Sequence, residues 1–204
     1  MKTIINPLLI SAFIFLQTAF VLSQNHNTLK KYNFSFSVMG GESIFAVKFI
    51  LTDNSYSNTQ PNLNVSGTYY LSDSKALKVD AGYTFTKPYS GLLEGDGNSR
   101  IEGSNMFSSK VSFLIGRFKP DEHFMYNFSI GLGVHVWKPG SLTDIDFNYK
   151  IEYQTEVNVL ASVGGSVGYR FTKRFGICAE AEFDMITGNR HSYFPLRGGV
   201  FYIF

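Results

Sequence analysis

Nine ionisable residues share one side of a two-residue alternation that runs through much of the chain. They fall on the same parity as glycine and serine, whereas the other parity is aliphatic or aromatic. The nine are Lys78, Asp80, Lys110, Glu156, Arg170, Glu180, Glu182, Asp184 and Arg197. Four positive and five negative groups on one face can form an ion-pair network or line a path for protons or ions. We predict a structural network, in which Arg197 pairs with Asp184 and Arg170 reaches for Glu180.

Histidine and serine are the other candidates for chemistry. A hydrolase that acts on membrane lipid needs a serine nucleophile beside a histidine base. The sequence offers His135, His191 and Ser192 for these roles, but none has a partner at a spacing typical of a hydrolase. The four histidines and the single Cys178 show no metal-ligand spacing. We therefore expect a protein that is not an enzyme and that uses no metal and no cofactor.

The charged positions belong to long runs in which apolar and polar residues alternate. The clearest are residues 156–171 and 175–185, which are joined by three residues. Valine, alanine, isoleucine and phenylalanine hold one parity and small or acidic residues hold the other; in the first run only Leu160 sits on the polar side. This period of two predicts two β-strands, and the short connection predicts an antiparallel hairpin. One face of this hairpin must meet hydrocarbon or a protein core.

Six further runs of this kind bring the number of predicted strands to eight. They cover residues 32–38, 62–71, 77–86, 107–116, 124–136 and 196–204. Leu114 breaks the polar parity of its run, and the apolar segment Ile44–Leu51 is not assigned to a strand. Loops are predicted at 52–61, from Lys87 to Asn105, from Lys138 to Tyr153 and from Thr187 to Pro195, and tight turns at 72–75, 119–123 and 172–174. Long and short connections therefore alternate, which places all the long loops at one end.

This asymmetry decides between two all-β architectures. A water-soluble sandwich would bury the apolar face, and its Greek-key connections do not predict alternating loop lengths. A barrel inserted in a membrane predicts short turns at one end and long loops at the other. Most runs also reach the roughly nine to eleven residues that a tilted strand needs to cross a bilayer. The predicted fold is an all-β, eight-stranded, antiparallel up-and-down transmembrane β-barrel, with a lumen too narrow for a water channel and filled by the charged network.

The N-terminal residues predict export. Lys2 gives a short basic region, residues 8–22 are largely apolar, and Ser23 is a small residue before Gln24. These features are typical of a cleaved secretory signal, and the apolar run is shorter than the roughly 20 residues of a spanning helix. We expect a signal peptide at residues 1–23 and a barrel domain at residues 24–204.

Composition excludes two further classes. The chain has 18 basic and 16 acidic residues with no dense basic run, so nucleic acid is not an expected partner. A single cysteine excludes an intramolecular disulfide. Phenylalanine and tyrosine total 32 residues, and many lie at the short-turn ends of the runs, as in an interfacial aromatic girdle.

The last strand carries a short motif that is typical of outer-membrane barrels. Arg197, Gly199, Tyr202 and Phe204 supply its polar residue, its glycine two positions later and its two terminal aromatics. On these residues and on the eight-run pattern, the chain resembles small bacterial outer-membrane proteins of the OmpA and OmpX kind and the Bacteroidetes-type outer-membrane β-barrel domain. The departure is that no peptidoglycan-binding domain follows the barrel, so anchoring to the cell wall is not implied.

The resemblance implies a place and a set of partners. It implies a monomer in the outer membrane of a Gram-negative bacterium, surrounded by outer-membrane lipid and inserted by the barrel-assembly machinery, which recognises the terminal motif. It further implies a structural or adhesive role, exerted on extracellular or envelope proteins through the long loops. Two alternatives stay open: a small barrel enzyme that acts on outer-membrane lipid, and a component of a secretion or envelope complex. A secreted β-sandwich is the third class.

Overall fold

The computed structural model describes the strands and short turns of the chain. It describes residues 34–48, 55–85, 89–90, 99–101, 105–119, 121–138, 142–144, 149–151, 154–187 and 191–204. The predicted signal peptide at residues 1–23 lies outside these ranges. In the part of the chain that is described, no helix has the length and apolar character needed to cross a bilayer.

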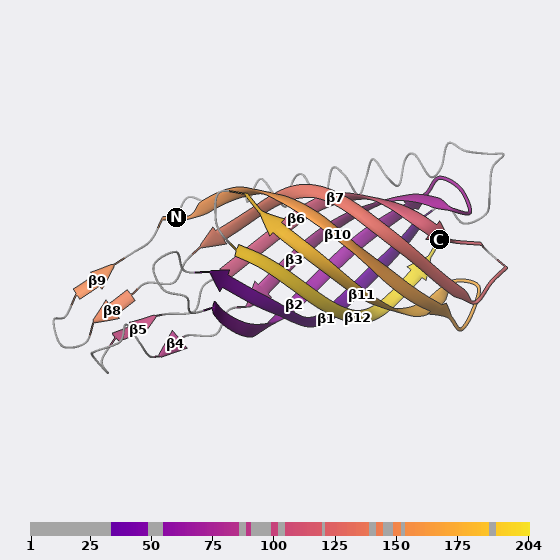
Figure 1. Cartoon of the computed structure of the whole chain (residues 1–204). Helices are drawn as coiled ribbons and strands as arrows, with labels where there is room; N and C mark the ends of the chain where they lie inside the picture. Colours follow the sequence, from indigo (N-terminus) through magenta and orange to yellow (C-terminus); the bar gives the residue numbers. More distant parts are fainter. Residues whose placement is uncertain are drawn as a thin grey trace, which may run out of the picture.

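Within the described residues, eight long strands form one closed barrel (Figure 1). They are β1 (Phe34–Lys48), β2 (Ser55–Tyr70), β3 (Lys75–Phe85), β6 (Asn105–Arg117), β7 (Phe124–Lys138), β10 (Glu156–Arg170), β11 (Phe175–Ile186) and β12 (His191–Ile203). Each strand pairs antiparallel with the barrel strands before and after it, and β12 closes the barrel on β1. The prediction of an eight-stranded antiparallel up-and-down barrel is confirmed. The alternative of an open sandwich is wrong for this chain, because the β1–β12 pairing leaves the barrel no free edge.

Three strands extend further than the sequence predicted. The unassigned Ile44–Leu51 continues β1 as far as Lys48, β2 begins at Ser55 inside a predicted loop, and β12 begins at His191 rather than at Leu196. Polar residues and proline in the extensions of β2 and β12 suggested loops, whereas residues 44–48 are apolar on both parities apart from Lys48. The backbones of all three extensions are nevertheless held in strands, because each is paired with a neighbouring barrel strand whatever its side chains.

The two longest predicted loops also contain strands. The segment predicted as a loop from Lys87 to Asn105 holds β4 (Tyr89–Ser90) and β5 (Ser99–Ile101), and the one from Lys138 to Tyr153 holds β8 (Leu142–Asp144) and β9 (Tyr149–Ile151). These strands form a small sheet in the order β4-β5-β8-β9, which lies beyond one end of the barrel at the left of Figure 1. Strands of two or three residues are too short for an alternating pattern to be read from sequence.

The two faces of the barrel wall are chemically opposite. Large apolar side chains point outward and are exposed, with Leu132 exposed to 66% and Val157 to 68%. Polar side chains point inward and are buried, with Glu182 and Asn64 each exposed to 1%. A water-soluble protein buries apolar area, so this inversion requires an apolar medium around the barrel.

Apolar clusters close the lumen at both ends. At the long-loop end, Met106, Leu160, Ile186 and Tyr193 pack together, with Trp137 against them. Two clusters occupy the short-turn end: Ala76, Leu114 and Phe118 with Tyr70, and Met125, Phe201 and Ile203 with Cys178. The two leucines that broke the polar parity, Leu160 and Leu114, are therefore lumen residues. Their places in the end clusters explain why the inward parity is not polar throughout.

Candidate functional site

Four strands bring most of the predicted charged residues together in the middle of the lumen. Glu180, Glu182 and Asp184 alternate along β11, so all three carboxylates point inward from one strand. The other contributors are Lys78 and Asp80 on β3, Lys110 on β6 and Arg197 on β12, and all seven residues are buried. Charged groups shielded from water in this way require partners.

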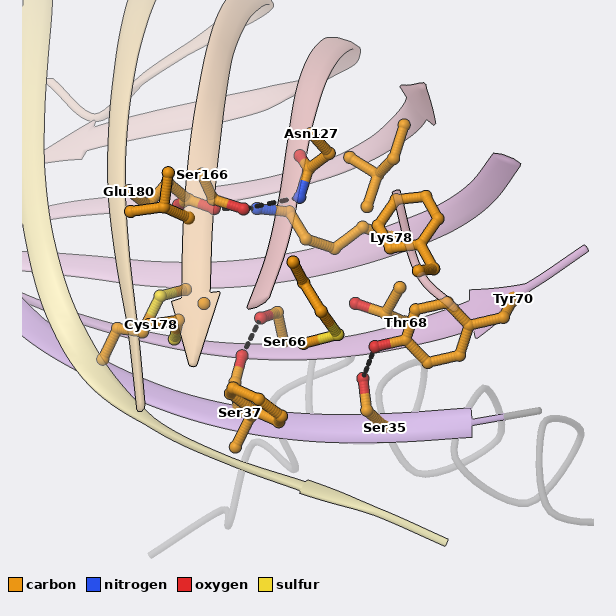
Figure 2. A pocket seen from close by; sticks show the side chains of 17 residues that line it. Ser35, Ser37, Ser66, Thr68, Tyr70, Lys78, Asn127, Ser166, Cys178 and Glu180 are labelled. Carbon is orange, nitrogen blue, oxygen red and sulfur yellow. Dashed lines mark hydrogen bonds and ion pairs between the residues drawn. The ribbon is translucent and has the colours of Figure 1, made fainter. Parts of the chain in front are cut away.

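Lys78 contacts three carboxylates. Its ammonium donates a hydrogen bond to Glu180, and it lies 3.3 Å from Oδ1 of Asp80 and 3.7 Å from Oε1 of Glu182. Glu180 is thus the closest partner of Lys78, and Figure 2 shows the two side chains meeting across the lumen from β3 and β11.

Lys110 and Arg197 complete the pairing. The Lys110 ammonium lies 2.5 Å from Oε2 of Glu182 and 3.4 Å from Oδ1 of Asp184. Nη1 of Arg197 donates to Oε1 of Glu180 at 2.9 Å and to Oε2 of Glu182 at 2.7 Å. The seven groups therefore form one chain of alternating sign, in the order Asp80, Lys78, Glu180, Arg197, Glu182, Lys110, Asp184.

The predicted partner of Arg197 is wrong. Asp184 was expected, but Arg197 pairs with Glu180 and Glu182. The prediction assumed that the last strand begins near Leu196, beside the outer end of β11. Because β12 begins at His191, the register places Glu180 opposite Arg197 and Tyr193 opposite Asp184.

The predicted partner of Arg170 is also different. Its guanidinium donates to the backbone carbonyls of Lys119 and Glu122, and not to Glu180. The backbone N–H of Arg170 also donates to the carbonyl of His123 at 2.7 Å. These bonds fix the turn between β6 and β7 against the end of β10. In that turn, hydrogen bonds from Arg117 hold the pKa of Glu122 below its usual value.

The ninth predicted residue lies apart from the chain of ion pairs. Glu156 is the first residue of β10 and pairs in register with Trp137, at the long-loop end of the barrel. Its side chain is partly exposed and is not one of the seven groups in the middle of the lumen.

A small polar cavity lies between the charged chain and the short-turn end. It has a volume of about 60 Å³ and is bordered by Lys78 and Glu180 on one side and by Tyr70 and Phe118 on the other. Hydroxyl and amide groups line its walls in bonded pairs: Ser37 with Ser66 at 2.6 Å, Ser35 with Tyr70 at 2.8 Å and Asn127 with Ser166 at 2.6 Å (Figure 2). A polar cavity of this size holds a few water molecules.

The candidate catalytic residues lie elsewhere. His135 is buried in the lumen, with its Nε2 3.3 Å from the hydroxyl of Tyr193. Ser192 lies on β12 in register with Ala46 and Met185, and the side chain of His191 is outside the described residues. In the described ranges, no three His, Cys, Asp or Glu side chains gather as they would around a metal ion.

Sequence reasoning missed two lumen residues that complete the network. Asn62 accepts a hydrogen bond from Nε of Arg197 at 3.3 Å and donates to Ser43 at 2.9 Å. Tyr193 approaches His135 and also contacts Met106. The inward parity of Asn62 was a usable signal, whereas Tyr193 fell inside a predicted loop and could not be assigned to a face.

The residues of the terminal motif lie along the seam between β12 and β1. Arg197 points inward, while the rings of Tyr202 and Phe204 point outward with their centroids 5.0 Å apart. Gly199 pairs with Met39, and a Cβ atom at this position would lie 2.1 Å from the carbonyl oxygen of Val38. Only glycine therefore fits this position without a backbone shift.

We expect alanine at position 199 to weaken closure of the barrel. The added methyl group would push β12 away from β1, so Gly199→Ala should lower the free energy of unfolding by about 1–3 kcal/mol. Urea unfolding of the purified chain, refolded in detergent without any assembly machinery, measures this effect.

Gly198 supplies the matched control. A Cβ atom there would meet its nearest neighbour, the carbonyl of Cys178, at an ordinary 3.9 Å, so Gly198→Ala should unfold with the wild type. If Gly199→Ala also unfolds with the wild type, the glycine has no structural role at the seam.

The fold defines the class of protein, and comparison with known proteins gives particular examples. The chain matches no protein-family model and no curated protein sequence. The structure of Ail, the attachment invasion locus protein of Yersinia pestis, aligns with a TM-score of 0.55 and 13% identity over 85% of this chain and 99% of Ail. Neisserial surface protein A aligns with a TM-score of 0.54 and 14% identity over 84% of this chain and 97% of that protein.

A third solved structure of the same kind is the outer-membrane protein OprG of Pseudomonas aeruginosa. It aligns with a TM-score of 0.53 and 12% identity, over 85% of this chain and 97% of OprG. The resemblance to small outer-membrane barrels that the sequence predicted is thus confirmed for the fold. Identities this low carry no information about ligand or partner.

Proposed function

We propose that this chain is a bacterial outer-membrane protein with a structural or adhesive role, exerted through the long connections at one end of a closed barrel. The proposal rests on the difference between the barrel, whose lumen is occupied by side chains, and the small sheet that lies beyond one end of it. The lumen is filled by ion pairs and capped by apolar clusters, so the barrel is suited to anchoring rather than transport. The small sheet of β4, β5, β8 and β9 extends beyond the barrel and is suited to contact with a partner (Figure 1).

Several features support the proposed location. The outward face is apolar along the strands, and aromatic residues gather at the short-turn end, where Phe34 packs near Phe204 and Phe171 near Phe175. Such a girdle is typical of the interface between hydrocarbon and water. We propose a signal peptide at residues 1–23 for export, and the residues Arg197, Gly199, Tyr202 and Phe204 for recognition by the assembly machinery.

The charge of the connections at the end of the barrel that carries this small sheet indicates the chemistry of the partner. Residues 49–54, 86–104, 139–155 and 188–190 contain seven acidic and four basic residues, a net charge of −3. Ail has been solved in complex with a heparin analogue, sucrose octasulfate. A polyanion of that kind would be repelled by net acidic loops, so we propose a protein partner with a basic surface.

Loop shortening tests the proposal. Cells that display the whole chain are compared with cells that display a variant in which residues 86–104 and 139–155 are replaced by short Gly-Ser turns. We expect the variant to lose most of the binding to immobilised basic proteins and most cell-to-cell aggregation. The barrel should remain in the outer-membrane fraction with heat-modifiable gel migration.

The contrary outcomes are equally defined. Equal binding and aggregation by the two strains would contradict an adhesive role of the loops. Uptake of small solutes by vesicles that contain the whole chain would contradict a closed lumen.

A further inference from the structure

The row of ion pairs in the lumen contains more carboxylates than cations. Among the described residues it contains the four carboxylates of Asp80, Glu180, Glu182 and Asp184 but only three cations, those of Lys78, Lys110 and Arg197. If all seven were ionised, the net charge would be 3 − 4 = −1. Because the signs alternate, both ends of the chain are carboxylates.

The surroundings make this excess charge costly. Every one of the seven groups is at least nine-tenths buried, and apolar clusters lie between these groups and both ends of the lumen. An uncompensated ion in such an interior is strongly disfavoured, and an acid there takes up a proton instead. One of the four carboxyl groups should therefore be neutral.

The contacts of the four carboxylates differ. Glu180 is bound by Lys78 and Arg197. Glu182 is bound by Arg197 and Lys110 and lies 3.7 Å from Lys78, so the two inner carboxylates have two and three cations. The end groups each have one, and only Asp184 receives a hydrogen bond from its cation, Lys110, at 3.4 Å.

Asp80 is the least compensated of the four. Lys78 lies 3.3 Å from its Oδ1 but donates its close hydrogen bond to Glu180. Among the described residues, neither oxygen of Asp80 has a hydrogen-bond partner, although the residue is only 2% exposed. We infer that Asp80 is a proton-binding site, a carboxyl group that stays neutral at neutral pH and balances the charge of the seven paired groups.

The groups on the neighbouring strands are consistent with this assignment. Ser66 on β2 and Lys110 on β6 are the register partners of Asp80, and Lys110 directs its ammonium to Glu182 and Asp184. Glu180 and Glu182 on β11 share Lys78 with Asp80, and their negative charge further opposes ionisation of Asp80.

In the part of the chain that the structure describes, three other basic groups lie inside the barrel, and none of them donates a hydrogen bond to Asp80. Arg197 on β12 is held by Glu180 and Glu182, and Arg170 by the turn carbonyls at the short-turn end. His135 on β7 contacts Tyr193, the register partner of Asp184 at the opposite end of the charged chain.

A bound metal ion is the competing way to neutralise the lumen. A hard cation needs several oxygen ligands around one point. The described residues contain no group of three His, Cys, Asp or Glu side chains that could hold an ion. The nearby cavity is lined by one carboxylate, that of Glu180, and by the ammonium of Lys78, which would repel a cation. A proton needs neither additional ligands nor space.

Infrared spectroscopy of the whole chain, refolded in detergent at pH 7 without sodium or potassium, tests the inference. We expect one protonated-carboxyl C=O band, which shifts when the chain is labelled with ¹³C-aspartate and disappears as the pH is raised. Asp80→Asn should remove the band while keeping the heat-modifiable migration of the folded barrel. Asp80→Glu keeps the number of carboxyl groups and should leave a band that no longer shifts with ¹³C-aspartate. The matched variant Asp184→Glu, at the other end of the row of ion pairs, should leave a band that still shifts.

Three results would overturn the inference. The first is the absence of a band in the wild type at pH 7, and the second is a band that persists in Asp80→Asn. The third is a ¹⁵N spectrum in which the ring of His135 carries both protons and so supplies the missing positive charge. If Asp80→Asn does not fold, the isotope shift in the wild type still decides between an aspartate and a glutamate. A urea midpoint that rises with added sodium, together with no band, would assign the site to a cation.

Discussion

Replacing Glu182 by glutamine is expected to lower the free energy of unfolding by about 3 kcal/mol, because it breaks the most heavily shared group in the lumen. The Glu182 carboxylate accepts Lys110 and Arg197 and lies 3.7 Å from Lys78. Glutamine keeps the shape and removes the charge, so all three cations lose a partner in an interior that hydrates them far less than bulk water does. Urea unfolding in detergent micelles or lipid vesicles measures the loss.

The size of this effect follows from what each cation retains. Lys110 keeps Asp184, Arg197 keeps Glu180, and Lys78 keeps Glu180 and Asp80. The cost therefore falls at the low end of the roughly 3–5 kcal/mol for breaking a buried pair. Removal of one negative charge also lets Asp80 ionise without a net charge, so the infrared band assigned to Asp80 should disappear in Glu182→Gln.

Glu122→Gln is the matched control. Glu122 pairs with Arg117 at the short-turn end, where both side chains are open to water. Solvent-exposed pairs contribute little to stability, so this variant should unfold with the wild type. If Glu182→Gln behaves as Glu122→Gln does, the lumen pairs are hydrated and the interior is not closed.

The sequence predicted the architecture because a two-residue period has a direct geometric meaning. Alternation assigned Lys78, Glu180 and Glu182 to the inward face. The alternation of long and short predicted connections indicated the up-and-down topology. Parity assigns a face, however, and does not say how deep in the lumen a residue lies. Leu114 and Leu160 therefore appeared as errors in the pattern, although they belong to the apolar clusters that cap the lumen.

Pairing within the site was harder to predict, because it depends on register. Moving the start of β12 from Leu196 to His191 changes the residue that faces Arg197 from the expected Asp184 to Glu180. Register is determined by where each strand ends, and polar residues at strand ends resemble loops in sequence. The β5–β8 pairing joins two different loops, and nothing local in either segment encodes a contact with the other.

Arginine at position 132 is expected to destabilise the barrel by about 2–4 kcal/mol, although the side chain that it replaces is one of the most exposed in the structure. Leu132 lies in the middle of β7, in register with Val111 on β6 and Ala161 on β10, on the apolar outer face. In water, an exposed substitution of this kind changes stability by less than about 0.5 kcal/mol. At the midplane of a bilayer, arginine must instead be drawn to the interface or hydrated by a local defect.

Phe124 supplies the depth control for this experiment. It is the first residue of β7, at the short-turn end, and it is exposed to 53%. The cost of arginine falls to about 0–1 kcal/mol near the interface, so Phe124→Arg should unfold close to the wild type in lipid vesicles. A difference between the two positions that appears in vesicles requires hydrocarbon around the middle of β7. Equal, negligible effects at both positions would mean that water surrounds the barrel, and the inverted burial of its two faces would then need another cause.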